Sequence, residues 1–68
     1  MVNIWDYVNA KEIKLTNMKG QEFIGTVMAI FDKDETYDEE DSIDVYVDGE
    51  DFGFLQSEIK SIEVLEFK

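Results

Sequence analysis

The chain of 68 residues contains no cysteine, no histidine and no arginine. Without cysteine and histidine, neither a disulfide nor a Cys/His metal cluster can stabilise the fold. Without an imidazole base, the few serine, threonine and lysine side chains lack the group that usually activates a nucleophile. The four glycines do not form a phosphate-binding loop pattern. We therefore expect a protein that is not an enzyme and that uses no cofactor.

Long apolar runs are also absent, so the sequence does not predict a membrane-spanning helix or a signal peptide. A composition without thiols is typical of intracellular proteins. We therefore expect a cytoplasmic protein with no membrane partner. At this length the chain forms a single domain, residues 1–68, with a thin hydrophobic core. A thin core favours stabilisation by oligomerisation.

The negative charge is concentrated in one part of the chain. The net charge is −11, and residues 32–51 contain eleven acids against the single cation Lys33. Residues 32–42 contain seven of these acids, and we expect them to form an extended, mobile acidic loop. Affinity for nucleic acid comes mainly from cations that release the counterions of phosphates, and here cations are few.

Within this loop, the alternate spacing of Asp32, Asp34 and Asp38 is like the start of a calcium-binding loop. Two later positions differ from that pattern. Tyr37 stands where the sharp turn needs glycine, and Ile43 stands where a bidentate glutamate is needed. The three aspartates are therefore weak calcium candidates, and a solvated acidic loop is the favoured interpretation.

Residues 11–31 predict an antiparallel hairpin that forms the first half of a small barrel. Apolar and polar residues alternate on both sides of a three-residue loop at 18–20. This loop places Leu15 opposite Phe23 and Ile13 opposite Gly25, so that the apolar side chains share one face. Gly20 supplies the positive φ that such loops need. Gly25, inside a strand, predicts a bend or a close backbone approach.

Residues 43–55 predict a second hairpin, because Asp48-Gly49 is a strong signal for a two-residue turn. The turn pairs Val45 with Phe52 and places Ile43 opposite Phe54. Residues 56–58 then predict a short turn, followed by a last strand in which an irregularity lets Ile59, Ile62 and Val64 face inward.

Leu65 and Phe67 are expected on the opposite face of this last strand, which is unusual for a strand edge in water. They would either cover the N-terminal helix or contact another subunit. Residues 3–9 predict that helix, with Asn3 as its N-cap. We interpret it as a lid that buries Trp5; the alternative is an exposed binding patch formed by Trp5 and Tyr7.

A short helix followed by five short strands predicts a mainly β fold, a strongly bent SH3-like barrel. The sequence most resembles the Sm-like family. The residues that carry the resemblance are Ile13, Leu15, Gly20, Phe23, Gly25, Val27, Asp32, Gly53, Phe54, Leu55, Ile59 and Ile62. The resemblance covers nearly the whole chain.

Sm-like proteins join their fourth and fifth strands into rings of about five to seven subunits. The resemblance therefore implies a homo-oligomer interface at Phe54, Leu55, Val64, Leu65 and Phe67. The family also binds single-stranded RNA in a pocket, whose positions here would be Asp32, Leu55 and Gln56. Of these, Asp32 is retained, whereas Leu55-Gln56 replaces a basic pair and the family's loop asparagine is missing.

Three functions follow from these observations. The first is a non-catalytic Sm-like module that assembles with itself or binds a partner protein. The second is an Sm-like RNA-binding protein, which the missing basic pair opposes. The third is an acidic inhibitor whose carboxylates imitate the phosphates of nucleic acid; the plain alternative is that the acids only keep the protein soluble. We favour the first.

Overall fold

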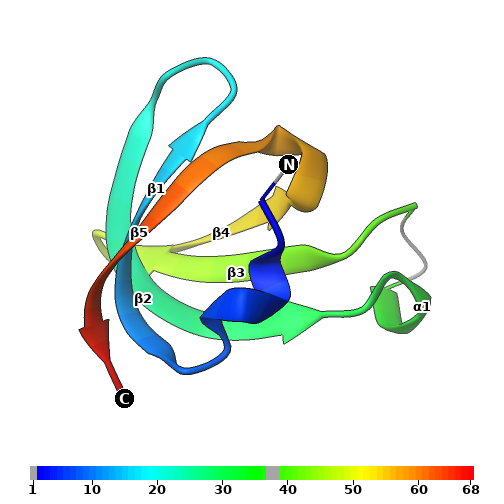
Figure 1. Ribbon diagram of the computed structural model, residues 1–68, viewed down its shortest axis with the longest axis horizontal. Coiled ribbons are helices and arrows are strands. Elements are labelled where there is room, and N and C mark those ends of the chain that lie inside the picture. Colours follow the sequence, from blue (N-terminus) through cyan, green and yellow to red (C-terminus); the bar gives the residue numbers. More distant parts are fainter. Residues whose placement is uncertain (1, 37–38) are drawn as a thin grey trace.

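The computed structural model describes residues 2–36 and 39–68 and consists of five antiparallel strands in one bent sheet (Figure 1). The order of strands in the sheet is β4-β3-β2-β1-β5. The strands are β1 (Ala10–Asn17), β2 (Glu22–Phe31), β3 (Ser42–Val47), β4 (Glu50–Leu55) and β5 (Ile59–Phe67). The 3₁₀ turn η1 (Ile4–Tyr7) precedes β1, the helical turn α1 (Lys33–Thr36) lies between β2 and β3, and the 3₁₀ turn η2 (Gln56–Glu58) connects β4 to β5. The mainly β, five-stranded fold expected from the sequence is confirmed.

Both hairpins have the predicted register. In the first, Leu15 lies opposite Phe23 and Ile13 opposite Gly25. In the second, Val45 pairs with Phe52 and Ile43 with Phe54. The hairpins therefore place their apolar side chains on one face, because residues directly opposite each other in antiparallel strands project to the same side.

The two hairpin turns use the conformations that their sequences favour. In the first turn, the Gly20 amide donates to the Asn17 carbonyl at 3.0 Å, and Gly20 has a φ of 83°. In the second turn, Asp48 and Gly49 have φ values of 49° and 84°. Positive φ at both central residues is the type I′ geometry, whose twist matches that of the flanking strands.

Gly25 marks the close backbone approach that its position in a strand predicted. A Cβ atom there would meet the carbonyl oxygen of Tyr46 and would lie 2.8 Å from Val47 Cγ2. Tyr46 is the β3 partner of Thr26, the residue that follows Gly25. The missing side chain therefore lets β2 bend tightly over β3.

The core lies on the concave face of the sheet and is closed at one side by η1. Its fully buried members are Ile4, Ala10, Ile13, Leu15, Ile43 and Val45. The prediction that Trp5 is the buried residue of the lid is wrong, because Ile4 is fully buried while Trp5 is 38% exposed. Asn3 does cap the turn, since its side-chain oxygen accepts from the Trp5 amide at 3.1 Å. One tight turn can direct only one of two consecutive side chains into the core.

The acidic segment 32–42 differs from the fully extended loop expected from its charge. Lys33–Thr36 form α1, and the Asp32 side chain accepts from the Asp34 amide at 2.8 Å. Aspartate is a favoured acceptor for the free amides at the start of a helical turn. Tyr37 and Asp38 lie outside the described residues.

Strand β5 contains irregularities at two places. Thr16 pairs with Ser61, but the next residue, Asn17, pairs with Ile59, so Lys60 forms a bulge. This bulge is the irregularity that we expected to let both Ile59 and Ile62 face inward. Two further shifts, around Lys11 and Leu65, bring Phe67 opposite the buried Ala10. Leu65 and Phe67 are both exposed, so neither side chain belongs to the buried core.

Candidate functional site

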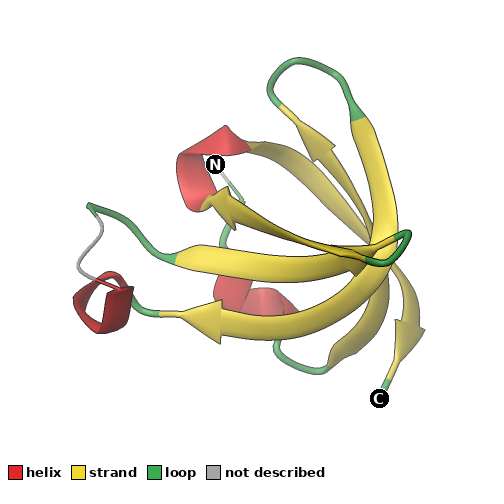
Figure 2. Ribbon diagram, turned by 180° about the vertical axis from the view of Figure 1, so that it is seen from behind, coloured by secondary structure: helices red, strands yellow, loops and turns green. Residues whose placement is uncertain are grey.

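The candidate site consists of the two free edges of the sheet. In the part of the chain that the structure describes, β4 pairs only with β3, and β5 pairs only with β1. Figure 2 shows β4 at the front of the bent sheet, running from the β3–β4 turn to η2. Each edge strand presents main-chain amide and carbonyl groups that another strand can pair with. The described part of the fold therefore has two sheet edges, β4 and β5, that are not paired with a further strand.

The side chains of the predicted interface divide into two groups. Leu65 is 43% exposed and Phe67 is 68% exposed, although both are large and apolar. Val64 is half-buried against Ile13. Phe54 is only 7% exposed, so its side chain belongs to the core and β4 offers mainly its backbone at this position. The structure thus places the accessible apolar side chains on β5.

The end of β5 is hydrogen-bonded to the segment before β1 and lies next to a mainly apolar hollow. The Lys68 amide donates to the Asn9 carbonyl at 2.9 Å. Lys11 Nζ lies 3.4 Å from Glu66 Oε1 in a solvent-exposed ion pair. Lys68 also borders a shallow hollow of about 160 Å³ whose other lining residues are Trp5, Val8, Val27, Met28, Ala29 and Ile30. Phe67 is therefore held at a defined place on the surface.

The three residues of the expected RNA pocket are occupied by contacts within the chain. The Gln56 side-chain oxygen accepts from the Ile4 amide at 3.1 Å. The Leu55 amide donates to the Glu58 carboxylate at 2.8 Å, and the Asp32 carboxylate caps α1. The side chain of Asp32 therefore positions α1, and the side chain of Gln56 positions η1.

Asp41 joins the elements that carry these pocket positions, and the sequence analysis did not identify it. Its carboxylate accepts hydrogen bonds from the backbone amide of Lys33 at 2.9 Å and from Trp5 Nε1 at 2.7 Å. Its backbone carbonyl accepts a hydrogen bond from the backbone amide of Gln56 at 3.0 Å. The hydrogen bond from Trp5, and then that from Lys33, lower the pKa of Asp41. One residue of the acidic segment thus connects η1, α1 and η2.

Glu40 has a similar positioning role that reasoning from charge missed. Its carboxylate accepts from the Ser57 amide at 2.7 Å and from the Ser57 hydroxyl at 2.6 Å. Nothing in the run of acids distinguishes Glu40 and Asp41 from their neighbours, because their partners are distant in sequence. Only the folded chain shows that they are structural acceptors.

The weak calcium candidates do not form a metal-binding cluster within residues 2–36 and 39–68, where no group of three metal-ligating side chains occurs. Of the three, Asp32 is engaged with α1, Asp34 is exposed, and Asp38 lies outside the described residues. The same two stretches of chain contain no helix that is long and apolar enough to cross a membrane.

Comparison with known proteins does not identify a relative of this chain. No protein-family model, no curated protein and no solved structure matches this chain. The edges of the sheet and the exposed side chains on β5 therefore carry the functional argument.

Proposed function

We propose that this protein is a non-catalytic, Sm-like interaction module that assembles into a closed homo-oligomer. In the proposed assembly, β4 of one copy pairs with β5 of the next. The observation that carries the proposal is the presence of two unpaired edges on one sheet, one of which exposes Leu65 and Phe67.

Pairing between different edges makes a head-to-tail contact, because each copy uses one edge to bind and leaves the other free. Head-to-tail contacts either grow into a filament or close into a ring. A bent sheet favours closure, because each added copy turns the direction of growth. A closed ring leaves no edge available for aggregation.

The distribution of charge is compatible with such a contact. Strand β5 and the residue after it carry Lys60 and Lys68 against Glu63 and Glu66, so this edge is neutral. The most acidic segment surrounds α1, which Figure 1 shows beyond the ends of β2 and β3, away from the end of β5. Added salt should therefore leave the assembly intact or strengthen it, because salt screens the remaining repulsion between copies.

The test is the solution mass measured by light scattering. We expect the wild type to exceed the monomer mass of 7.9 kDa several-fold, and Leu65→Lys with Phe67→Lys to reduce it to the monomer. The reason is that two buried cations would oppose a contact that the apolar side chains stabilise.

The matched control is Met18→Lys with Ile24→Lys, which adds the same charge at exposed apolar positions outside β4 and β5. This control should keep the wild-type mass. A monomeric wild type, or an interface variant of unchanged mass, would contradict the proposal.

A further inference from the structure

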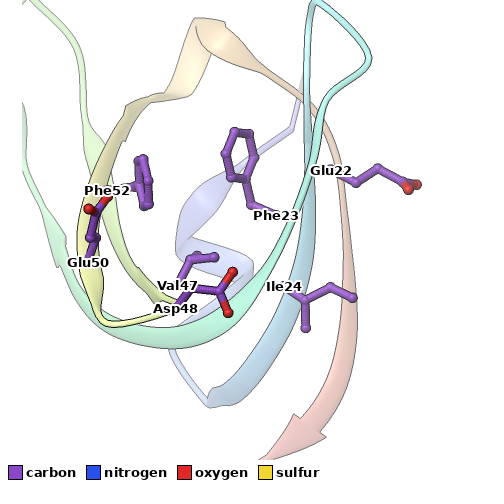
Figure 3. A pocket seen from close by; sticks show the side chains of 7 residues that line it. All are labelled: Glu22, Phe23, Ile24, Val47, Asp48, Glu50 and Phe52. Atoms are coloured by element: carbon purple, nitrogen blue, oxygen red, sulfur yellow. The ribbon is translucent and has the colours of Figure 1, made fainter.

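A second surface feature is a hollow of about 720 Å³ between the start of β2, the β3–β4 turn and the first half of the edge strand β4. Figure 3 shows the side chains around it. They come from Glu22, Phe23, Ile24, Val47, Asp48, Glu50 and Phe52. This volume is in the range of sites that bind a drug-sized molecule or a few side chains of a peptide.

The floor of the hollow is aromatic. The ring of Phe23 lies 5.6 Å from that of Phe52 and 5.1 Å from that of Phe54, measured between centroids. Phe54 and Val47 are buried, whereas Phe23 and Phe52 remain half-buried and face the hollow. Such ring contacts fix the positions of the phenylalanine side chains, so this apolar surface is preorganised for binding.

The rim of the hollow is negatively charged, and none of its lining residues in the described part of the chain is a cation. Glu22 and Ile24 point away from it in Figure 3, and Glu22 faces Lys14 at 3.6 Å. This leaves Asp48 and Glu50, which are exposed and have no ion-pair partner in the described part of the chain. No lysine lines the hollow among those residues.

We infer that this hollow binds a segment of another protein in which an aromatic or large aliphatic side chain lies next to lysine or arginine. The apolar side chain would contact Phe23 and Phe52, and the adjacent cation would face Asp48 and Glu50. Complementary charge beside an apolar contact directs binding towards such a segment and away from acidic ones.

A second copy of this chain is a poorer match to the hollow, because it carries seventeen acids against six lysines. The hollow and the proposed ring both involve β4, but they use different groups of it. The ring uses the outer backbone edges of β4 and β5, whereas the hollow uses side chains on the concave face. Side-chain variants at Asp48 and Glu50 therefore test the hollow and leave the backbone edge of β4 in place.

The test is an NMR titration of the ¹⁵N-labelled full chain with a blocked lysine–tryptophan–lysine tripeptide. We expect shifts in the amides of Phe23 and of residues 47–52, with a Kd of about 1 mM. Glutamate–tryptophan–glutamate and lysine–serine–lysine tripeptides serve as the probe controls, and both should bind at least ~5-fold more weakly, because each lacks one of the two matching contacts.

The variant Asp48→Asn with Glu50→Gln should raise the Kd by ~3–10-fold, which is the expected effect of losing two exposed ion pairs. Asparagine tolerates the positive φ of Asp48, so the turn should be retained. Glu39→Gln with Glu63→Gln removes the same charge at exposed positions outside the hollow, and should change the Kd by less than ~2-fold.

Several outcomes would overturn the inference. They are the absence of shifts, shifts centred outside the hollow, an acidic tripeptide that binds equally well, and equal weakening by both double variants. Dilution of the protein alone provides a further check. If the signals of Phe23 and Val47, which line the hollow outside β4 and β5, shift on dilution, a second copy occupies the hollow and the inference is wrong.

Discussion

At Gly25, a single missing side chain sets the path of β2. The carbonyl oxygen of Tyr46 fills the space that a Cβ atom would take, and Val47 crowds it from the other side. The backbone of a paired strand cannot shift to relieve a clash as easily as the end of a flexible side chain can. Any larger residue must therefore push β2 and β3 apart.

We predict that Gly25→Ala lowers the free energy of unfolding by about 2 kcal/mol or more through this overpacking. The midpoint of urea unfolding measures the effect. Gly53→Ala is the matched control, because its new Cβ would meet only the side-chain oxygen of Asp44, at 3.2 Å. An unchanged midpoint for Gly25→Ala would show that β2 does not need this close approach.

At the scale of elements, the acidic segment both carries charge and fixes neighbouring turns. Glu40 binds Ser57 of η2, and Asp41 binds Trp5 of η1 and the first residue of α1. Carboxylates are strong acceptors for free amides at the starts of helical turns. The segment therefore connects three short elements that would be unstable by themselves.

We predict that Trp5→Phe raises the pKa of Asp41 towards its usual value, because it removes the hydrogen bond that contributes most to lowering it. Carboxyl-carbon NMR titration measures this change. Tyr7→Phe is the control, since the Tyr7 hydroxyl contacts the Ile62 carbonyl and not Asp41. If the pKa of Asp41 is the same in both variants, the Trp5 contact has no electrostatic role.

The lowered pKa also gives the sign of a pH dependence. Ionised Asp41 stabilises the fold at pH values above its unfolded pKa, and this contribution is lost as the pH falls through the folded pKa. Trp5→Phe should therefore reduce the difference in stability between neutral and acidic pH. The measurement is the urea midpoint at several pH values.

At the scale of the whole molecule, charge decides which partners are attracted. The net charge is −11, there is no arginine, and Lys11 and Lys14 already face Glu66 and Glu22. Binding to nucleic acid requires cations that displace counterions from phosphates. We therefore expect this surface to repel nucleic acid at long range.

We predict no measurable binding of oligo-uridine or oligo-adenosine at physiological salt. Besides the charge, Gln56 is engaged with Ile4 at one position where an RNA pocket would need a free basic group. Fluorescence anisotropy of labelled oligonucleotides provides the measurement. A micromolar Kd would contradict the prediction and favour the RNA-binding alternative.

The strands, the hairpin registers and the class of fold can be read from local patterns in the sequence. Alternating residues such as Ile13 and Leu15 reveal which face is buried, and Asp48-Gly49 reveals where a turn must occur. These signals are local, because strand alternation and turn conformation depend on residues close together in the chain. The exposed apolar character of Leu65 was visible for the same reason.

The folded structure selects which of several similar residues performs each role. It buried Ile4 in place of Trp5, brought Phe67 opposite Ala10, and selected Glu40 and Asp41 from a run of acids. It also brought Phe23 and Phe52 together beside Asp48 and Glu50, with the buried Phe54 packed against Phe23. These outcomes depend on contacts between residues far apart in the chain, which no local pattern encodes.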